Sequence, residues 1–248
     1  MLTEERLQRI VELVEKHKSV STQMLMDELG ISESTARRDL NMLDEQGNLI
    51  RVRGGAMIKE EQFSTKDDAV SVRKDKHQDE KRKIARYAAS LIQPNDFVYL
   101  DAGTTTELLI DYLKEENVVF VTNAVTHAKK LSDKGYTTYL PGGEFKATTE
   151  AIVGDEAALS LQKYNFTKGF WGTNGVSLTA GFSTPDVKEA MVKRAAMLNC
   201  ARCYVLCDSS KFSQISCVKF GDFANADIIT TKVTEEEFAH CDNILEVR

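Results

Sequence analysis

A run of short polar side chains and one glycine has the composition of an anion-binding loop. It follows an apolar stretch at residues 97–100 and precedes a helix-like segment. Its members are Asp101, Gly103, Thr104, Thr105 and Thr106. Backbone amides and hydroxyls at a junction of strand, loop and helix are arranged to receive a phosphate group. A Gly-Thr turn can equally be a simple helix cap, so this run alone leaves both interpretations open.

Small and polar residues also follow the later strand-like stretches. In an open α/β sheet, the loops at the carboxyl ends of the strands form the ligand site. Glycines there allow close approach of the backbone, Asn and Thr bind hydroxyls, and lysines balance a phosphate. The sequence therefore adds to the first run Thr122, Asn123, Gly142, Gly143, Thr173, Asn174, Gly175, Lys188, Glu189, Lys193, Asp208 and Lys211. For Lys188 and Lys193 taken singly, a solvated helix face shared with Glu189 is the alternative.

A second polar group lies on one face of a predicted helix. Ser32 is suited to cap a helix that runs to about Gln46. Apolar residues point to one side of its helical wheel and polar residues to the other. The polar face holds Ser34, Arg37, Arg38 and Asn41. Guanidinium groups bind guanine edges or phosphates, hydroxyls bind phosphates, and an amide pairs with adenine, so this face predicts a helix that enters the major groove of DNA.

A strand, a glycine turn and a return strand are predicted at residues 49–58. Arg51 and Arg53 lie two apart and share one face of the first strand, where they can reach the DNA backbone or the minor groove. Ile50 and Val52 are expected on the opposite face, toward the core. The alternative for these arginines is a solvated surface on which they pair with Glu33, Asp39 or Asp44.

Two earlier helices complete a DNA-binding module. The first has an apolar stripe made of Leu7, Ile10, Val11 and Val14. Ser21 is a plausible N-cap of a second helix through Leu29, and Gly30 supplies the turn that follows. Residues 1–58 therefore predict a winged helix-turn-helix domain. Its expected DNA contacts are Ser21, Thr22, Ser32, Ser34, Thr35, Arg37, Arg38, Asn41, Arg51 and Arg53.

The charge of this module does not by itself indicate a nucleic-acid binder. Residues 1–58 contain eight Lys and Arg against ten Asp and Glu, so the signal is the placement of the arginines. One module that neutralises about four phosphates binds weakly by the counterion-release rule. Binding by two or more copies is therefore favoured.

The remainder of the chain predicts a larger α/β domain. Residues 59–76 are charged and aperiodic and are interpreted as a linker, which leaves 77–248 for the second domain. Strand-like and helix-like segments alternate there, which is typical of a mostly parallel sheet covered by helices. The expected strands are at 97–100, 118–121, 137–140, 169–171, 204–207 and 228–230.

Composition excludes several classes of protein. The 248 residues are 42% hydrophobic, but no run reaches the roughly 18 apolar residues of a membrane span, and Glu4, Glu5 and Glu12 oppose a secretory signal. We therefore expect a cytoplasmic protein that does not associate with a membrane. The five cysteines are odd in number, which disfavours a disulfide framework. Cys200 and Cys203 have C-x-x-C spacing without a second ligand pair, so no metal and no cofactor is expected.

The chain resembles the DeoR family of bacterial regulators. The resemblance rests first on residues 34–40 of the predicted third helix and on residues 49–56 of the wing. It extends through 101–106, 122–124, 142–143, 172–175, 192–194 and 208–211, and so covers essentially the whole chain. Within the family, the helix-turn-helix proper spans about residues 20–39, and the run from Arg37 to Asp39 belongs to the recognition helix.

This resemblance implies a function. It implies a repressor of a carbohydrate-utilisation operon, of the fructose or the lactose and tagatose phosphotransferase type, that binds double-stranded operator DNA as a homodimer or homotetramer. The effectors of the family are phosphorylated sugars, which the resemblance places in the loops given above. The sensor domain of the family is similar in fold to ribose-5-phosphate isomerase and coenzyme A transferases.

Two alternatives remain open at this stage. One is a sugar-phosphate isomerase fused to a helix-turn-helix, and such an enzyme needs a carboxylate base beside the carbon it deprotonates. Related isomerases carry acidic residues in the loop that here reads Gly172, Thr173, Asn174 and Gly175, which contains none. The other alternative is an activator or a protein-interaction module with the same wing.

Overall fold

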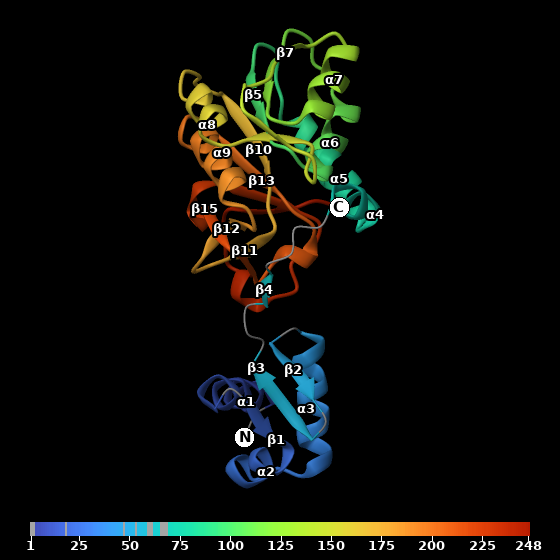
Figure 1. Cartoon of the computed structure of the whole chain (residues 1–248). Coiled ribbons are helices and arrows are strands. Elements are labelled where there is room, and N and C mark those ends of the chain that lie inside the picture. The colour runs from blue at the N-terminus through green and yellow to red at the C-terminus, as the bar shows by residue number, and fades with distance from the viewer. Residues whose placement is uncertain (1–2, 18, 47, 53, 59–61, 65–68) are drawn as a thin grey trace. The chain divides into compact units, whose positions relative to one another are not determined.

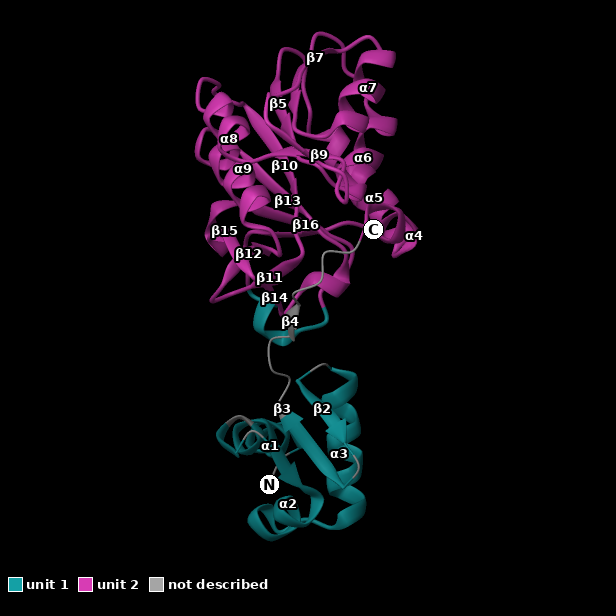
Figure 2. Ribbon diagram, viewed as in Figure 1, with its two compact units in different colours: residues 1–62, 234–240 teal, residues 63–233, 241–248 magenta. Residues whose placement is uncertain are grey.

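The computed structural model describes residues 3–17, 19–46, 48–52, 54–58, 62–64 and 69–248 (Figure 1). The chain divides into two compact units, Met1–Gln62 with Thr234–His240, and Phe63–Val233 with Cys241–Arg248 (Figure 2). We call the first the DNA-binding unit and the second the sensor unit, and describe each by itself. Arg53, 59–61 and 65–68, which fall in the predicted wing and linker, lie outside the described residues.

The DNA-binding unit is a winged helix-turn-helix. Its elements are α1 (Thr3–His17), β1 (Ser19–Ser21), α2 (Thr22–Leu29), α3 (Glu33–Glu45), β2 (Leu49–Val52) and β3 (Gly55–Ile58), and its sheet has the antiparallel order β1-β3-β2. Ser21 and Ser32 cap α2 and α3 as predicted, because each side chain accepts a hydrogen bond from a backbone amide in the first turn. Gly30 ends α2 with a φ of 65°, a conformation that favours glycine.

The core of this unit forms from the apolar faces of all three helices and the sheet. Its buried members are Ile10, Val14, Val20, Leu25, Leu40, Leu43, Leu49 and Ala56. An ion pair lies beside them: Arg6 Nε is 2.6 Å from Asp39 Oδ2, and the Asp39 side chain is fully buried. Asp39 therefore joins α3 to α1, although the sequence places it within the recognition-helix run.

The prediction that Ile50 and Val52 face the core is wrong for Val52. Val52 is 40% exposed and Ile50 only half-buried, whereas Leu49 is buried. β2 is an edge strand, and Val52 lies opposite Gly55, which has no side chain to cover it. Arg51 is exposed, as predicted.

The sensor unit is built on a seven-stranded parallel sheet in the order β17-β16-β13-β10-β5-β6-β7. Its strands are β5 (Phe97–Leu100), β6 (Val119–Thr122), β7 (Thr137–Tyr139), β10 (Lys168–Gly172), β13 (Cys203–Leu206), β16 (Asp227–Thr230) and β17 (Ile244–Glu246). All six predicted strands lie in this sheet, and β17 was not predicted. The α/β fold with a mostly parallel sheet is thereby confirmed.

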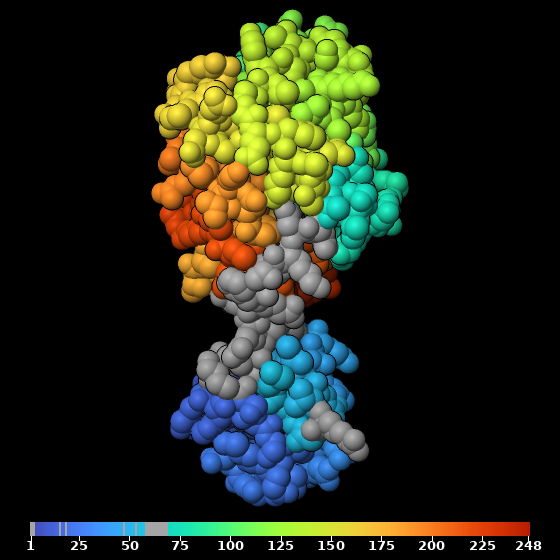
Figure 3. All heavy atoms as spheres, viewed as in Figure 1, coloured from blue at the N-terminus to red at the C-terminus, as the bar shows by residue number. Residues whose placement is uncertain are grey.

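Helices cover both faces of this sheet. α5 (Gln78–Ser90), α6 (Thr104–Leu109) and α7 (Val125–Asp133) lie on one side, and α8 (Asp155–Leu161) and α9 (Val187–Leu198) on the other (Figure 1). The first group buries Ile84, Leu109 and Leu131 against Phe120 and Phe170 of the sheet. On the face drawn in Figure 3, α8 and α9 form the yellow to orange part of the surface.

Short elements surround the main sheet. β11 (Gly175–Ser177), β12 (Gly181–Thr184) and β15 (Val218–Gly221) form a three-stranded sheet, β8 (Glu144–Lys146) pairs with β9 (Ala151–Val153), and β14 (Gln214–Ser216) pairs with β4 (Gln62–Ser64). Short 3-10 turns of the sensor unit lie at Ile110–Tyr112 (η1), Ser209–Lys211 (η2) and Phe223–Asn225 (η3), and Glu236–Phe238 (η4) lies in the segment that groups with the DNA-binding unit. The segment interpreted as a linker contains β4 and a helix, α4 (Val70–Asp75). α4 has six residues, none of them buried, so it shows no hydrophobic period.

None of the helices in the described part of the chain is long and apolar enough to cross a bilayer. Among those same residues, no cluster of three or more His, Cys, Asp and Glu side chains is placed to hold a metal ion.

Candidate DNA-binding surface and ligand pocket

The exposed face of α3 carries the polar residues that the sequence assigns to DNA reading. Ser34, Arg37, Arg38 and Asn41 are all exposed, and Ala36, Leu40 and Leu43 are buried beneath them. The side chains of Arg37 and Arg38 are more than half exposed. The helix therefore exposes two guanidinium groups, an amide and a hydroxyl, which are groups that can bind base edges and phosphates.

The acidic residues weighed as partners of the wing arginines have other contacts in the structure. Arg37 Nη2 is 2.5 Å from Glu33 Oε1, an exposed pair one turn apart that stabilises little. Asp44 accepts a hydrogen bond from the backbone amide of Arg51, at 2.9 Å. Asp39 pairs with Arg6 in the core.

Four of the other predicted DNA contacts have hydroxyls that bind within the protein. Ser21 caps α2, and Thr22 Oγ1 donates to the carbonyl of Gly54 at 3.1 Å, which ties α2 to the wing turn. The hydroxyls of Ser32 and Thr35 are 2.9 Å apart at the start of α3. These residues position the recognition helix and the wing.

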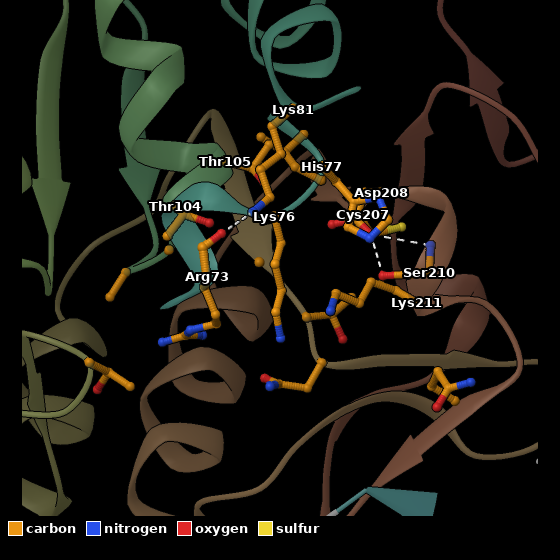
Figure 4. Close-up of a pocket in the computed structure, with 18 of the residues that line it drawn as sticks. Arg73, Lys76, His77, Lys81, Thr104, Thr105, Cys207, Asp208, Ser210 and Lys211 are labelled. Carbon is orange, nitrogen blue, oxygen red and sulfur yellow. Dashed lines mark hydrogen bonds between the residues drawn. The ribbon is translucent and has the colours of Figure 1, made fainter. Parts of the chain in front are cut away.

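A cavity of about 450 Å³ opens in the sensor unit at the carboxyl edge of the main sheet (Figure 4). Nine residues predicted from the sequence line it: Gly103, Thr104, Thr105, Thr173, Asn174, Glu189, Lys193, Asp208 and Lys211. Further lining residues are Arg73, Lys76, His77, Lys81, Ala102, Thr149, Gly172, Leu206, Cys207, Ser210 and Gln214. Loops far apart in the sequence thus meet at one edge of the sheet, as parallel strands require.

The floor of the cavity rests on a buried ion pair. The Lys193 ammonium of α9 contacts Asp101 Oδ2 and also donates to the carbonyl of Gly172 at 3.1 Å. Burial raises the pKa of Asp101, and the charge of Lys193 opposes this shift. Asp101 Oδ1 is buried without a hydrogen-bond partner.

Other predicted residues support the cavity from behind. Thr106 donates to the carbonyl of Asp101 at 2.7 Å, and Asn123 accepts from the amide of Ala102 at 3.0 Å. Thr122 accepts from the amide of Ala124 at 3.1 Å. The bonds of Thr106 and Asn123 fix the shape of the loop that follows β5, and that of Thr122 lies in the loop after β6.

Besides Asp101, Thr106, Thr122 and Asn123, four more predicted residues lie outside the lining of the cavity. Lys188 is exposed and forms an ion pair with Glu144. Gly175 has a packing role, since a side-chain carbon there would lie 2.3 Å from the carbonyl oxygen of Gln214. Gly142 and Gly143 follow β7, and the turn between β7 and β8 does not reach the cavity.

Sequence reasoning missed a group of cationic residues on the segment interpreted as a linker. Arg73 and Lys76 come from α4 and its end, and Lys81 from the first turns of α5 (Figure 4). Burial lowers the pKa of Lys81; Asp208 opposes this shift, while the positive charges of Lys211, Arg73 and Lys76 add to it. Only the basic composition of residues 73–83 could have indicated this group.

Glu80 fixes the start of α5 beside the cavity. It accepts hydrogen bonds from the amide of Ser209 at 3.1 Å, from the hydroxyl of Thr231 at 2.6 Å and from His77 at 2.9 Å. Burial opposes ionisation of this carboxyl, but the hydrogen bonds outweigh it and lower its pKa to about 2. Glu80 thus stays ionised and holds α5 to the loop after β13.

The opposite wall carries hydrogen-bonding groups suited to hydroxyls. Glu189 accepts from Thr149 at 2.5 Å and pairs with Lys146 at 3.3 Å. Asn174, which also lines the cavity, accepts a hydrogen bond through Oδ1 from Thr184 at 3.3 Å. The lining contains five Lys and Arg residues against two carboxylates, Glu189 and Asp208. Lys193 is already paired with Asp101, and the four other cations still outnumber the carboxylates, so the cavity favours an anion.

Comparison with known families agrees with both units. The DeoR-like helix-turn-helix domain matches residues 6–62, and the DeoR C terminal sensor domain matches residues 76–233. The latter match alone spans more than half of the chain.

Curated relatives match over nearly their full length. The HTH-type transcriptional regulator FruR of Bacillus subtilis (strain 168) is 44% identical over 96% of this chain and 94% of its own. The lactose phosphotransferase system repressor of Staphylococcus aureus (strain N315) is 34% identical over 94% of this chain and 92% of its own.

Similarity to solved structures is distant. The sorbitol operon regulator SorC from Klebsiella pneumoniae is 11% identical with a TM-score of 0.36, covering 83% of this chain and 89% of that one. Ribose 5-phosphate isomerase A from Methanocaldococcus jannaschii is 17% identical with a TM-score of 0.39, over 54% of each chain. On the two domain matches and the full-length relatives, the chain belongs to the DeoR family of transcriptional regulators.

Proposed function

We propose that this protein represses a carbohydrate-utilisation operon in the cytoplasm and leaves its operator when a phosphorylated sugar binds the sensor unit. The observation that carries the proposal is a cavity lined by five Lys and Arg residues against two carboxylates, in the same chain as an exposed recognition face on α3. The relatives named for a lactose phosphotransferase system support a sugar operon.

The two ends of the cavity suit the two ends of such a ligand. Arg73, Lys81 and Lys211 form a cationic end that receives the phosphate, with the hydroxyls of Thr104 and Thr105 beside it. Asn174 and Glu189 accept or donate hydrogen bonds to sugar hydroxyls at the other end. Charge selects the phosphate, and the polar wall selects the sugar.

The regulator is favoured over an isomerase by the state of the carboxylates. The loop after β10, residues 172–175, contains none. Glu189 is paired with Lys146 and bonded to Thr149, and Asp208 accepts from the amide of Ser210, so both are held as acceptors. A catalytic base needs a carboxylate free to take a proton from the substrate.

We further propose that DNA is bound by a homodimer or homotetramer. The exposed arginines that α3 and β2 of one module contribute, Arg37, Arg38 and Arg51, neutralise too few phosphates for tight binding. Two modules that neutralise about eight phosphates give a slope of log K against log salt near −7. A slope half as steep would indicate a single module on the DNA.

Isothermal titration of the full-length protein with hexose phosphates and with the same sugars lacking phosphate tests the ligand class. We expect heat from at least one sugar phosphate and none from its unphosphorylated partner, because the cationic end lacks a ligand in the latter. Equal affinity for both forms would overturn the assignment of the cavity to a phosphorylated sugar.

A further inference from the structure

α4 is the most weakly held helix that contributes to the cavity. None of its residues is buried. Its ties to the rest of the sensor unit include the amide of Val70 donating to Thr148 at 3.2 Å, an exposed ion pair of Lys74 with Glu107 at 2.9 Å, and Lys81 donating to the carbonyl of Arg73. A helix of six residues without a buried face has little stability of its own.

α5, the next helix, is firmly held. Ile84, Ala85 and Ala88 are fully buried in the main core, and Glu80 accepts the three hydrogen bonds described above. Between the two helices, His77 has a φ of 52°, in the left-handed region that non-glycine residues adopt at a cost. A strained junction thus joins a weakly held helix to an anchored one, and it lies in the lining of the cavity.

The charges at this junction repel one another. Arg73 and Lys76 lie on the same side of the cavity as Lys81 (Figure 4), and Lys211 adds a further positive charge to this group. Asp208 opposes the effect of these charges on Lys81. The Nε of Arg73 is buried without a hydrogen-bond partner, which is costly for a charged donor unless an acceptor arrives.

We propose that α4 is the ligand-dependent wall of the cavity: an anionic group held between Arg73, Lys76, Lys81 and Lys211 fixes α4 in the position described. This inference rests on the proposed function. Arg73 and Lys76 reach the anion only when α4 is in place, whereas Lys81 and Lys211 reach it in either case. The ligand therefore binds the closed form more tightly, which is the condition for shifting a conformational equilibrium.

The position of α4 in the sequence gives this equilibrium a regulatory role. Residues 59–69 alone separate β3 of the DNA-binding unit from α4. β4 lies within this stretch and pairs with β14 of the sensor unit. Releasing α4 together with this pairing changes how many residues join the two units, and so which spacings of DNA half-sites a pair of recognition helices can match. Ligand binding is in this way coupled to operator affinity.

Hydrogen–deuterium exchange of the full-length protein tests this inference, with inorganic phosphate and a set of hexose phosphates as probes and the unphosphorylated hexoses as controls. We expect exchange in residues 70–76 to slow by at least about fivefold on binding, the lower end of ordinary allosteric coupling. Exchange in residues 82–90 of α5 should stay unchanged, since that segment is already anchored.

Two variants and a matched control sharpen the test. Arg73→Gln and Lys76→Gln should each weaken ligand binding and reduce the protection of residues 70–76 at saturating ligand. Lys83→Gln removes the same charge from an exposed position of α5 outside the lining and should behave as the unaltered protein.

The outcomes separate this inference from the proposed function. If a sugar phosphate binds and protects residues 101–106 and 208–211 while exchange in 70–76 is unchanged, the inference is overturned and the proposed function stands. If no probe binds by calorimetry or exchange, both are overturned.

Discussion

Lys193 on α9 forms a buried ion pair with Asp101 at the end of β5, although 92 residues separate them in the sequence. Asp101 Oδ2 also accepts from the amide of Gly172 at the end of β10, at 3.1 Å. The Asp101 carboxylate therefore joins the neighbouring strands β5 and β10 to α9, a helix that covers one face of the sheet. The floor of the ligand cavity is held by this contact, which depends on the parallel order of the strands.

Removing one partner of this pair should destabilise the sensor unit strongly. Lys193→Met leaves Asp101 buried without its cation, and we expect a loss of about 3 to 5 kcal/mol in the free energy of unfolding. Urea unfolding followed by the fluorescence of Trp171 reports this unit, because Trp171 is fully buried in it and is the only tryptophan.

The double variant Asp101→Asn with Lys193→Met checks that the loss comes from the uncompensated charge. The two changes together should cost clearly less than the sum of the single changes. Additive losses would mean that the two side chains act independently and that the pair does not hold the floor.

Arg37→Ala should weaken operator binding by about 10- to 100-fold, the usual cost of removing a guanidinium contact to a base. Arg37 is exposed on the recognition face of α3, and its contact within the protein is a solvated pair with Glu33. Arg9→Ala is the matched control, since it removes the same charge from an exposed position on α1. Equal losses from both variants would show that bulk charge, rather than the face of α3, binds the DNA.

Asp39→Asn should abolish operator binding through the fold of the DNA-binding unit. Arg6 then loses its ionised partner in the core, and α1 loses its polar tie to the recognition helix. Circular dichroism should show an earlier loss of helix, while the Trp171 transition of the sensor unit keeps its midpoint. A variant that binds DNA normally would show that this pair is dispensable.

His127 should make the sensor unit lose stability as pH falls from 7 to 5. Burial lowers the pKa of His127 to about 3 in the folded protein, against 6.5 when unfolded. Between these values the unfolded chain binds a proton that the folded chain does not, so stability falls with pH. The part due to His127 between pH 7 and 5 is about 2 kcal/mol.

His127→Gln isolates that contribution. Glutamine keeps a neutral amide donor near the carbonyl of Gly103, which His127 contacts, but does not titrate. Glu80, with a pKa of about 2, contributes stability that is lost only below about pH 5 and so lies outside this window. The variant should show a difference between pH 7 and 5 that is smaller by about 2 kcal/mol; an unchanged difference would exclude His127 as the cause.

The main sheet was predictable because buried parallel strands are apolar over their whole length. Phe97–Leu100 has this pattern and was placed at the correct bounds. β1 was missed because Val20 is its single apolar residue. Val52 was placed in the core because an alternating pattern does not show which residues of an edge strand lie beyond the buried core. The loops of the site followed from the sheet, since parallel strands place their carboxyl ends together.

The cationic group of Arg73, Lys76 and Lys81 was not predictable in the same way. Hydrophobic periodicity reports burial, and α4 has no buried face. Arg73 and Lys81 come together because the chain turns at His77, which has a left-handed backbone conformation. No local sequence pattern predicts that conformation. Asp39 was likewise grouped with the exposed arginines beside it, because a helical wheel of α3 does not show that Arg6 of α1 lies on the buried side and pairs with Asp39.

The central claim, that one chain joins an operator-binding unit to a sensor of phosphorylated sugars, is tested most directly by fluorescence anisotropy. The probe is a labelled DNA fragment from immediately upstream of the gene, titrated with the full-length protein at fixed salt, alone and with each sugar phosphate. We expect tight binding that one sugar phosphate weakens by at least about fivefold and its unphosphorylated form leaves unchanged. Tight binding that no sugar phosphate alters, or no binding to the fragment in any condition, would contradict the account.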